Sequence, residues 1–186
     1  NRPDWSLEVN TQASLSDLDP NAIQFAREQY KEKHPTLAAE VDRWTDPIFL
    51  NKAKVCINEK ITNAALLLLG KEESGHLISP AVGQITWVLK DHKGVEKDYQ
   101  HFHVPLILAV GRVFSKIRNL TYRYNPNATL FPLEVTEYDP WVIREILHNC
   151  IAHQDYSKNS KINLVENPDS LVFTNVGEFI PGSVEN

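Results

Sequence analysis

The sequence predicts a mixed α/β protein, because helix-start signals and alternating strand patterns follow one another along the chain. Three helices are expected to begin alike, with an aspartate that can cap the helix before a proline that suits its first position. These starts are Asp19-Pro20, Asp46-Pro47 and Asp139-Pro140. Polar and apolar residues alternate around a turn between 82 and 102, which predicts a β-hairpin. A second strand pair is expected at 161–166 and 170–174, on either side of an Asn-Pro-Asp turn.

The composition excludes several classes of protein. Of the 186 residues, 42% are hydrophobic and 23% are charged, as in an ordinary soluble domain and unlike a disordered chain or a collagen. No apolar run approaches the roughly 20 residues that cross a bilayer, so no membrane partner is expected. The net charge of −5 means that any nucleic-acid contact needs a local basic patch or residues outside this chain.

Cysteine usage and the chain start indicate the compartment and the extent of the protein. Two cysteines in unrelated contexts, without a secretory signal, favour the reducing cytoplasm over a disulfide scaffold. Met is absent even at position 1, so we expect the chain to be a piece of a longer protein.

The first half of the chain is expected to be mainly helical after a polar start. Residues 1–16 lack periodicity and predict a linker or an arm. The first helix should end near Lys33, because Pro35 disfavours helical geometry in the residue before it. Residues 55–57 predict a short strand. Residues 61–70 fit either a helix capped by a threonine or a buried strand, and their length favours the helix.

The second half is expected to continue from the hairpin into two more helices. Apolar residues at helical spacing follow Pro105 and predict a long amphipathic helix. Residues 120–138 predict a strand and loops, and the third Asp-Pro helix should run to about His153. We expect a domain boundary between 125 and 138. It would separate a middle α/β region, 17–125, from the start of a second domain, 135–186.

The helix after Asp139 carries the residues that point to chemistry. Glu145 and Asn149 are one helical turn apart, so their side chains lie one above the other. An amide oxygen can bind Mg²⁺, and a carboxylate beside it can orient or deprotonate a water. By their spacing alone, these two residues are better explained as part of a solvated polar helix face than as a Mg²⁺ site. His153 lies beside this pair at the end of the helix, and two roles are open for it. It could interact with the helix dipole, or it could form a wall of a nucleotide site together with Asp155.

The flanking residues carry a resemblance to a known family. Arg144-Glu-x-x-x-Asn149-x-x-x-His153-x-Asp-Tyr156 is followed by Asn175-x-Gly177, with similar segments at 63–70 and 180–182. The chain resembles the C-terminal part of helicase RecG-related proteins. These are bacterial transcriptional regulators with an ATPase-like domain of the gyrase, heat-shock chaperone and histidine-kinase (GHKL) type. The resemblance implies part of a GHKL-type α/β sandwich from about residue 135.

The same resemblance implies the roles of the site residues. Glu145 would activate water, Asn149 would hold Mg²⁺, and Asn175 and Gly177 would contact the adenine of ATP. The superfamily has Asp-x-Gly-x-Gly where this chain has an Asn at 175 and Phe179 at the second glycine. An Asn oxygen can still accept from the adenine amino group, without charge assistance. The sequence ends before a second glycine-rich lid, so we do not expect this chain to hydrolyse ATP.

Partners outside this chain are implied in the same way, and two other functions remain open. Family members usually carry a schlafen-like (Alba-type) DNA-binding domain and a winged helix, and neither is recognisable here. One alternative is a DNA-binding regulator in which the ATPase-like fold only scaffolds. The other is an interaction module, a homo-oligomer in which the hairpin at 82–102 pairs with another subunit. A basic cluster could contact phosphates, although a solvated helix face is the commoner explanation. Its members are Arg112, Lys116, Arg118 and Arg123.

Overall fold

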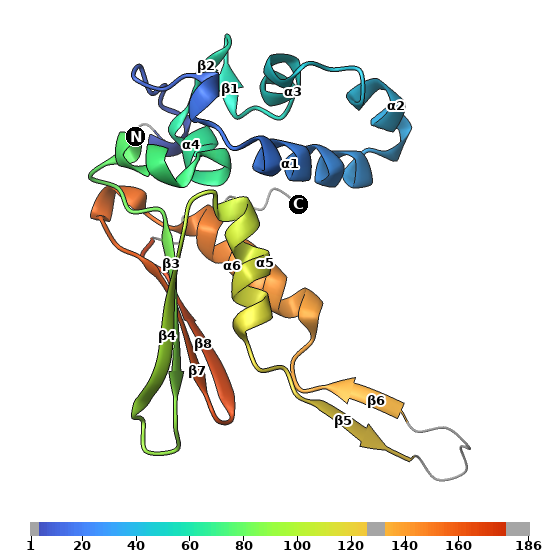
Figure 1. Ribbon diagram of the computed structural model, residues 1–186, viewed down its shortest axis with the longest axis vertical. Coiled ribbons are helices and arrows are strands. Elements are labelled where there is room, and N and C mark those ends of the chain that lie inside the picture. The colour runs from blue at the N-terminus through green and yellow to red at the C-terminus, as the bar shows by residue number, and fades with distance from the viewer. Residues whose placement is uncertain (1–3, 126–132, 178–186) are drawn as a thin grey trace, which may run out of the picture.

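The computed structural model describes residues 4–125 and 133–177, and these form a mixed α/β fold, as the sequence predicts. A helical lobe stands on a second lobe built around a β-sheet, and a two-stranded arm projects from the sheet lobe (Figure 1). None of the helices within the described ranges is long and apolar enough to span a membrane.

The two Asp-Pro helices of the helical lobe form where the sequence predicts them, but only one is capped as predicted. Asp46 is the first residue of its helix (Asp46–Lys52) rather than the cap, which is Thr45, and the Asp46 carboxylate accepts from Arg27 instead. In α1 (Pro20–Lys33), the Asp19 carboxylate accepts hydrogen bonds from the backbone N–H groups of Asn21 and Ala22, so the predicted cap is confirmed. Thr62 caps α4 (Asn63–Leu69) by accepting from Ala65 N–H, which decides the ambiguous segment in favour of a helix. The other elements of the lobe are α2 (Ala38–Val41), α3 (Asp46–Lys52), β1 (Cys56–Ile57), β2 (Lys60–Ile61) and four 3₁₀ helices (Trp5–Leu7, Leu15–Asp17, Pro35–Leu37 and Glu72–Ile78).

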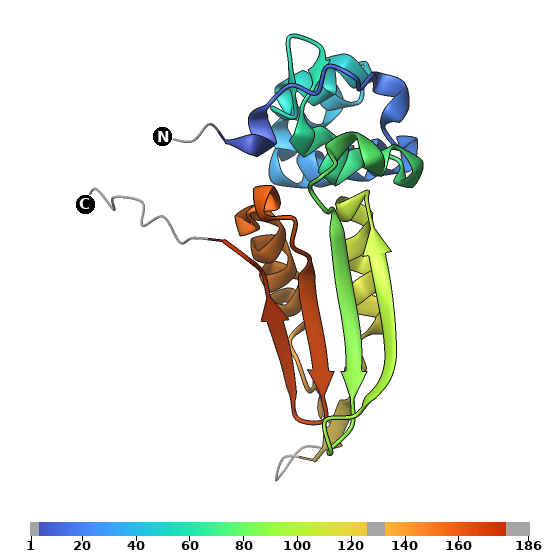
Figure 2. The same cartoon turned by 90° about the vertical axis from the view of Figure 1, so that its left-hand side faces the viewer.

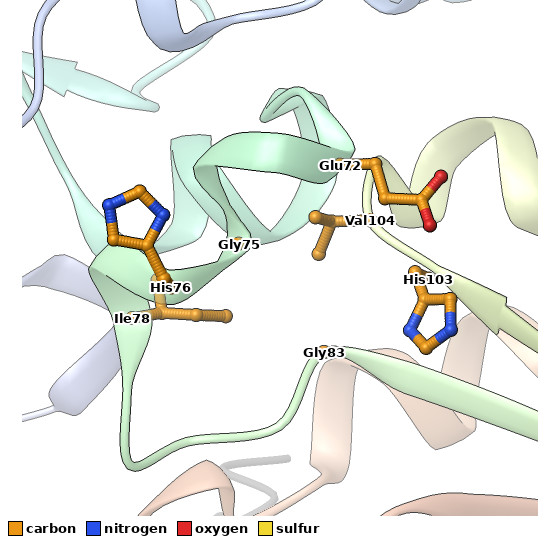
Figure 3. Close-up of a pocket in the computed structure, with 7 residues that line it drawn as sticks. All are labelled: Glu72, Gly75, His76, Ile78, Gly83, His103 and Val104. Atoms are coloured by element: carbon orange, nitrogen blue, oxygen red, sulfur yellow. The ribbon is translucent and has the colours of Figure 1, made fainter.

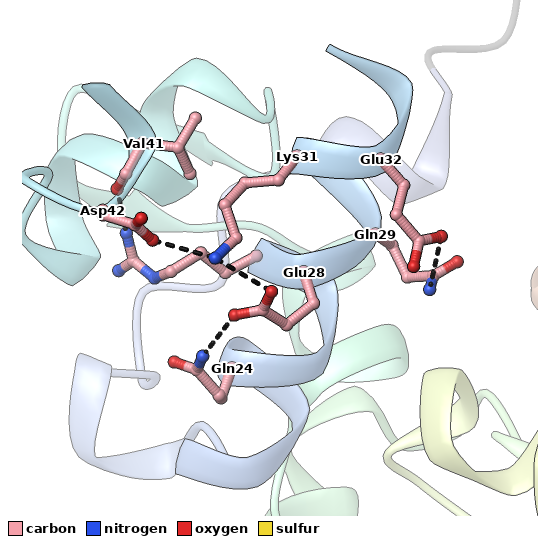
Figure 4. Close-up of polar contacts among 8 residues, drawn as sticks. Gln24, Glu28, Gln29, Lys31, Glu32, Val41 and Asp42 are labelled. Atoms are coloured by element: carbon pink, nitrogen blue, oxygen red, sulfur yellow. Dashed lines mark hydrogen bonds and ion pairs between the residues drawn. The ribbon is translucent and has the colours of Figure 1, made fainter. Parts of the chain in front are cut away.

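A buried arginine joins α1 to the segment that follows it. Arg27 is only 7% exposed, and its guanidinium donates to the carbonyls of Val41 and Trp44 and to the Asp46 carboxylate. It also lies 4.7 Å over the ring of Phe49. On the exposed side of α1, polar contacts continue the link, including an ion pair between Lys31 and Asp42 at 2.9 Å (Figure 4).

The polar start of the chain is docked on the body of the protein, whereas the sequence predicts a linker or an arm for residues 1–16. Val9 forms a β-bridge with Thr62, and the Asn10 side chain donates to the carbonyl of Leu77 at 2.8 Å. Trp5 stacks on Tyr156, with ring centroids 5.4 Å apart. These partners are all more than 50 residues away, so local periodicity cannot reveal them.

One four-stranded sheet runs through the second lobe in the order β4-β3-β7-β8. The predicted hairpin is β3 (Gln84–Lys90) with β4 (Glu96–His103), and the predicted second pair is β7 (Ile162–Asn167) with β8 (Ser170–Thr174). Both pairs are antiparallel, and β3 joins β7 in parallel, with Trp87 opposite Leu164.

The parallel β3–β7 pairing corrects the expected domain boundary. Strands on both sides of 125–138 belong to the same sheet, so residues 17–125 and 135–186 are not separate packing units. The visible division lies before β3, where the helical lobe gives way to the sheet lobe (Figure 2).

Two helices cover one face of the sheet and leave the other face open (Figure 2). They are α5 (Leu106–Lys116), on β3 and β4, and α6 (Pro140–His153), on β8. The core beneath them contains Ile85, Trp87, Ile162 and Leu164, each 2% exposed or less. This helix-covered face positions α6, which carries the predicted acid and amide.

The arm consists of β5 (Thr121–Tyr124) and β6 (Leu133–Thr136), paired antiparallel. Asn119 fixes its base, because the side chain donates to the Tyr138 carbonyl and accepts from the Tyr138 N–H. Pro126 and Pro132, within the stretch predicted as a strand and loops, lie outside the described residues.

Candidate functional site at the end of helix α6

Helix α6 has the predicted bounds because its ends are chemically defined. The Asp139 carboxylate accepts from the backbone N–H of Trp141 at 2.8 Å, and Pro140 occupies the first helical position. At the other end Gln154 leaves the helical conformation, and its side chain donates to the Ser160 carbonyl. Ile143, Leu147, Cys150 and Ile151 are the buried residues of the helix.

Glu145 and Asn149 lie on the exposed side of α6, opposite its buried stripe. Neither side chain lines either hollow described below. Within residues 4–125 and 133–177, no group of three or more His, Cys, Asp or Glu is arranged to hold a metal ion. The pair therefore offers an amide oxygen and a carboxylate to solvent, without a wall opposite them in the described part of the chain.

The Asn175–Gly177 segment lies directly against the C-terminal end of α6. The Val176 N–H donates to the Gln154 side-chain oxygen at 2.8 Å, and the Asp155 N–H donates to the Val176 carbonyl at 2.5 Å. A Cβ at Gly177 would lie only 2.1 Å from the His153 carbonyl oxygen, so this approach requires glycine. The fold thus brings together two motifs that are more than 20 residues apart in the sequence. Phe179 and residues 180–182 lie outside the described residues.

A hollow of about 1390 Å³ opens beside this junction, between the two lobes. Three of the predicted site residues line it, namely His153, Asp155 and Gly177, whereas Glu145, Asn149 and Asn175 do not. The helical lobe supplies walls that sequence reasoning missed, among them Trp5, Ala64, Leu67 and Leu68. The one signal in the sequence was Trp5, because a large aromatic residue in a mostly polar N-terminal segment indicates that the segment packs against the protein. The volume exceeds that of most small-molecule pockets, so the hollow can admit a ligand of nucleotide size.

The lining combines apolar, aromatic and titratable groups. The Ser157 hydroxyl and N–H bond the Asp155 carboxylate and hold its pKa below the usual range. Partial burial lowers the pKa of the His148 ring and so favours its neutral form, which has one donor and one acceptor. The buried Tyr156 hydroxyl donates to the Ile151 carbonyl at 2.8 Å, and burial raises its pKa. Asp4 and Glu8 make part of the rim acidic.

A smaller cleft of about 260 Å³ lies where the lobes join, lined by Glu72, His76 and His103 among others (Figure 3). Figure 3 shows Glu72 and His103 at one end and His76 at the other. None of the predicted site residues reaches this cleft.

The basic cluster does not form a patch open to phosphates. Lys116 pairs with Asp98 at 3.1 Å, Arg118 pairs with Glu166 at 3.1 Å, and Arg123 pairs with Glu134 at 2.5 Å. Three of its four cations are thus engaged by carboxylates of the chain itself.

Comparisons with known proteins add a family model and a fold. A model described as a domain of unknown function, DUF8451, matches residues 1–83, which correspond to the helical lobe up to β3. No curated protein matches the sequence. The crystal structure of the DIP2311 protein from Corynebacterium diphtheriae is similar, with a TM-score of 0.71 over 95% of this chain at 18% identity. The match covers 34% of that protein's chain, and at this identity it shows the fold alone.

Proposed function

We propose that this chain is part of a cytoplasmic RecG-related regulator and binds an adenine nucleotide with Mg²⁺ along α6, from Glu145 to the C-terminal end of the helix. One observation carries the proposal: the Asn175–Gly177 segment is hydrogen-bonded to the end of the helix that bears Glu145 and Asn149. The resemblance implies that the residues of these two motifs share one nucleotide. Their junction also borders a hollow of sufficient volume.

The donor chemistry of these residues suits such a ligand, although Glu145 and Asn149 lie outside the hollow. Mg²⁺ in nucleotide sites commonly takes only one or two protein oxygens and completes its shell with phosphates and water, so the exposed Asn149 oxygen suits it. The bound Mg²⁺ would neutralise part of the negative charge of the phosphates. By the resemblance Glu145 would orient water, and it lies about two turns along the helix, or about 12 Å, from His153. Asn175 would accept from the base, and Gly177 lets the chain approach closely.

The DNA contact implied by the resemblance is proposed for other parts of the protein. The described surface does not favour it here, because Lys116, Arg118 and Arg123 are already ion-paired.

Titration calorimetry with Mg-ATP tests the proposal. We expect the parent chain to bind, and Asn149→Ala to weaken binding at least about tenfold, or about 1.4 kcal/mol, because an Mg²⁺ ligand is lost. Asn21→Ala removes another exposed amide, from α1, and serves as the matched control. Absence of heat with the parent, or equal affinity in both variants, would contradict the proposal.

A further inference from the structure

The N-terminal segment that lines the hollow is fixed to the helical lobe through its backbone. The Asn63 side chain donates to the Trp5 carbonyl at 3.0 Å, and the Asn63 N–H donates to the Glu8 carbonyl at 2.9 Å. Further along, the Asn10 N–H donates to the Ile61 carbonyl at 2.8 Å. These bonds use backbone groups of the segment, so they remain available when the Trp5 side chain is replaced.

The ring of Trp5 is supported on one side and borders the hollow. It is half-buried and stacks on Tyr156, with ring centroids 5.4 Å apart and planes inclined by 28°. Tyr156 is itself only 6% exposed, so it supports the indole from the side of the protein. Because Trp5 also lines the hollow, part of the indole is presented to a ligand there. A flat base stacks on such a ring through its π-face, whatever its hydrogen-bonding groups.

The indole lies close to the segment that would contact the adenine. Tyr156 directly follows Asp155, whose N–H donates to the Val176 carbonyl. Figure 2 shows the start of the described chain beside the C-terminal end of α6, as the contact of Trp5 with Tyr156 requires. Trp5 and the Asn175–Gly177 segment therefore border the same part of the hollow, one from each lobe.

Charge on the lining distinguishes the two ends of a nucleotide. The carboxylates of Asp4 and Glu8 flank Trp5 in the chain and line the hollow with it. Within the described part of the lining, the Lys158 ammonium is ion-paired with Asp155 at 3.4 Å. Phosphates placed beside these carboxylates would be repelled, whereas an uncharged base would not. The lining therefore favours a base beside Trp5, with the phosphates further along α6.

We propose that Trp5 is the residue on which the adenine base of the nucleotide stacks. This inference rests on the proposed function and adds the wall of the site that the helical lobe supplies. The base would meet Asn175 with its amino edge and Trp5 with its ring face, so the two contacts do not compete. The sheet lobe then holds Mg²⁺ and the phosphates at Asn149, and the N-terminal segment covers the base.

Titration calorimetry with Mg-ATP and with magnesium tripolyphosphate tests this role, because tripolyphosphate carries phosphates without a base. We expect the parent chain to bind both ligands. Trp5→Ala should weaken Mg-ATP binding about tenfold or more, as expected for the loss of one base–aromatic stack. It should leave tripolyphosphate binding within about twofold of the parent. Trp5→Phe keeps an aromatic ring and should regain most of the lost Mg-ATP affinity.

Trp141→Ala is the matched control for this experiment. Trp141 is 69% exposed at the start of α6 and does not line the hollow, so its loss should leave both affinities unchanged. Equal Mg-ATP affinity of the parent and Trp5→Ala would overturn the role of Trp5 alone, whereas a parent that binds no Mg-ATP would overturn the proposed function with it.

The tripolyphosphate measurements separate stacking from a structural role. If Trp5→Ala lost both ligands equally, Trp5 would only hold the wall in place, and the stacking proposal would be wrong. A parent that binds Mg-ATP but not tripolyphosphate would overturn the division of the ligand between the two lobes.

Discussion

At Glu166 a single carboxylate joins three parts of the sheet lobe. The side chain is 3% exposed and accepts from the Trp87 indole N–H at 2.9 Å and from the Arg118 N–H and Nε at 3.1 Å. It thereby holds the segment after α5 to β7. The sequence predicts the strand that contains Glu166 but not its burial, because its partners are 48 and 79 residues away.

Replacing this carboxylate tests its contribution to stability. Glu166→Gln should lower the free energy of unfolding by about 2 kcal/mol, because an NH₂ group that cannot accept replaces one carboxylate oxygen and the remaining hydrogen bonds lose their charge assistance. Glu134→Gln is the control, since Glu134 forms an exposed ion pair with Arg123 that should contribute less than about 1 kcal/mol. Urea unfolding measures both values. If the two substitutions lowered the free energy of unfolding equally, burial would not strengthen the contribution of Glu166 to stability.

The helices and hairpins follow from local chemistry, whereas the contacts between them do not. The bounds of α6 and the β7–β8 hairpin are confirmed because caps and turns act within a few residues. The docking of Asn175–Gly177 on the end of α6 depends instead on how β8 returns along the helix. Apart from the family resemblance, only the glycine itself signals this docking, and most glycines in a sequence have no such role.

Gly177→Ala tests that docking. A Cβ at this position meets the His153 backbone, so the segment must move and the bonds of Val176 to Asp155 and Gln154 weaken. We expect a loss of about 1–2 kcal/mol in the free energy of unfolding, with weaker Mg-ATP binding. Gly111→Ala in α5 meets no neighbouring atom and should stabilise the chain by about 0.5–1 kcal/mol. Thermal and urea unfolding of both variants would contradict this account if their effects had the same sign.

At the scale of the whole molecule, two lobes meet around a shared hollow. The parallel pairing of β3 with β7 makes residues 84–174 one lobe, and the docked N-terminal residues bring Trp5 onto Tyr156. Neither feature follows from the sequence, because strand order and lobe contacts arise from non-local packing. The predicted site is therefore only partly assembled, with His153, Asp155 and Gly177 at the hollow and Glu145 and Asn149 further along the same helix.

Hydrogen–deuterium exchange with and without Mg-ATP tests the nucleotide site most directly, because it locates the ligand along the chain. The account predicts slower exchange in the last two turns of α6, in residues 174–177 and in the N-terminal residues that line the hollow, and no change in the arm. Protection confined to other elements, or unchanged exchange throughout at saturating Mg-ATP, would contradict it.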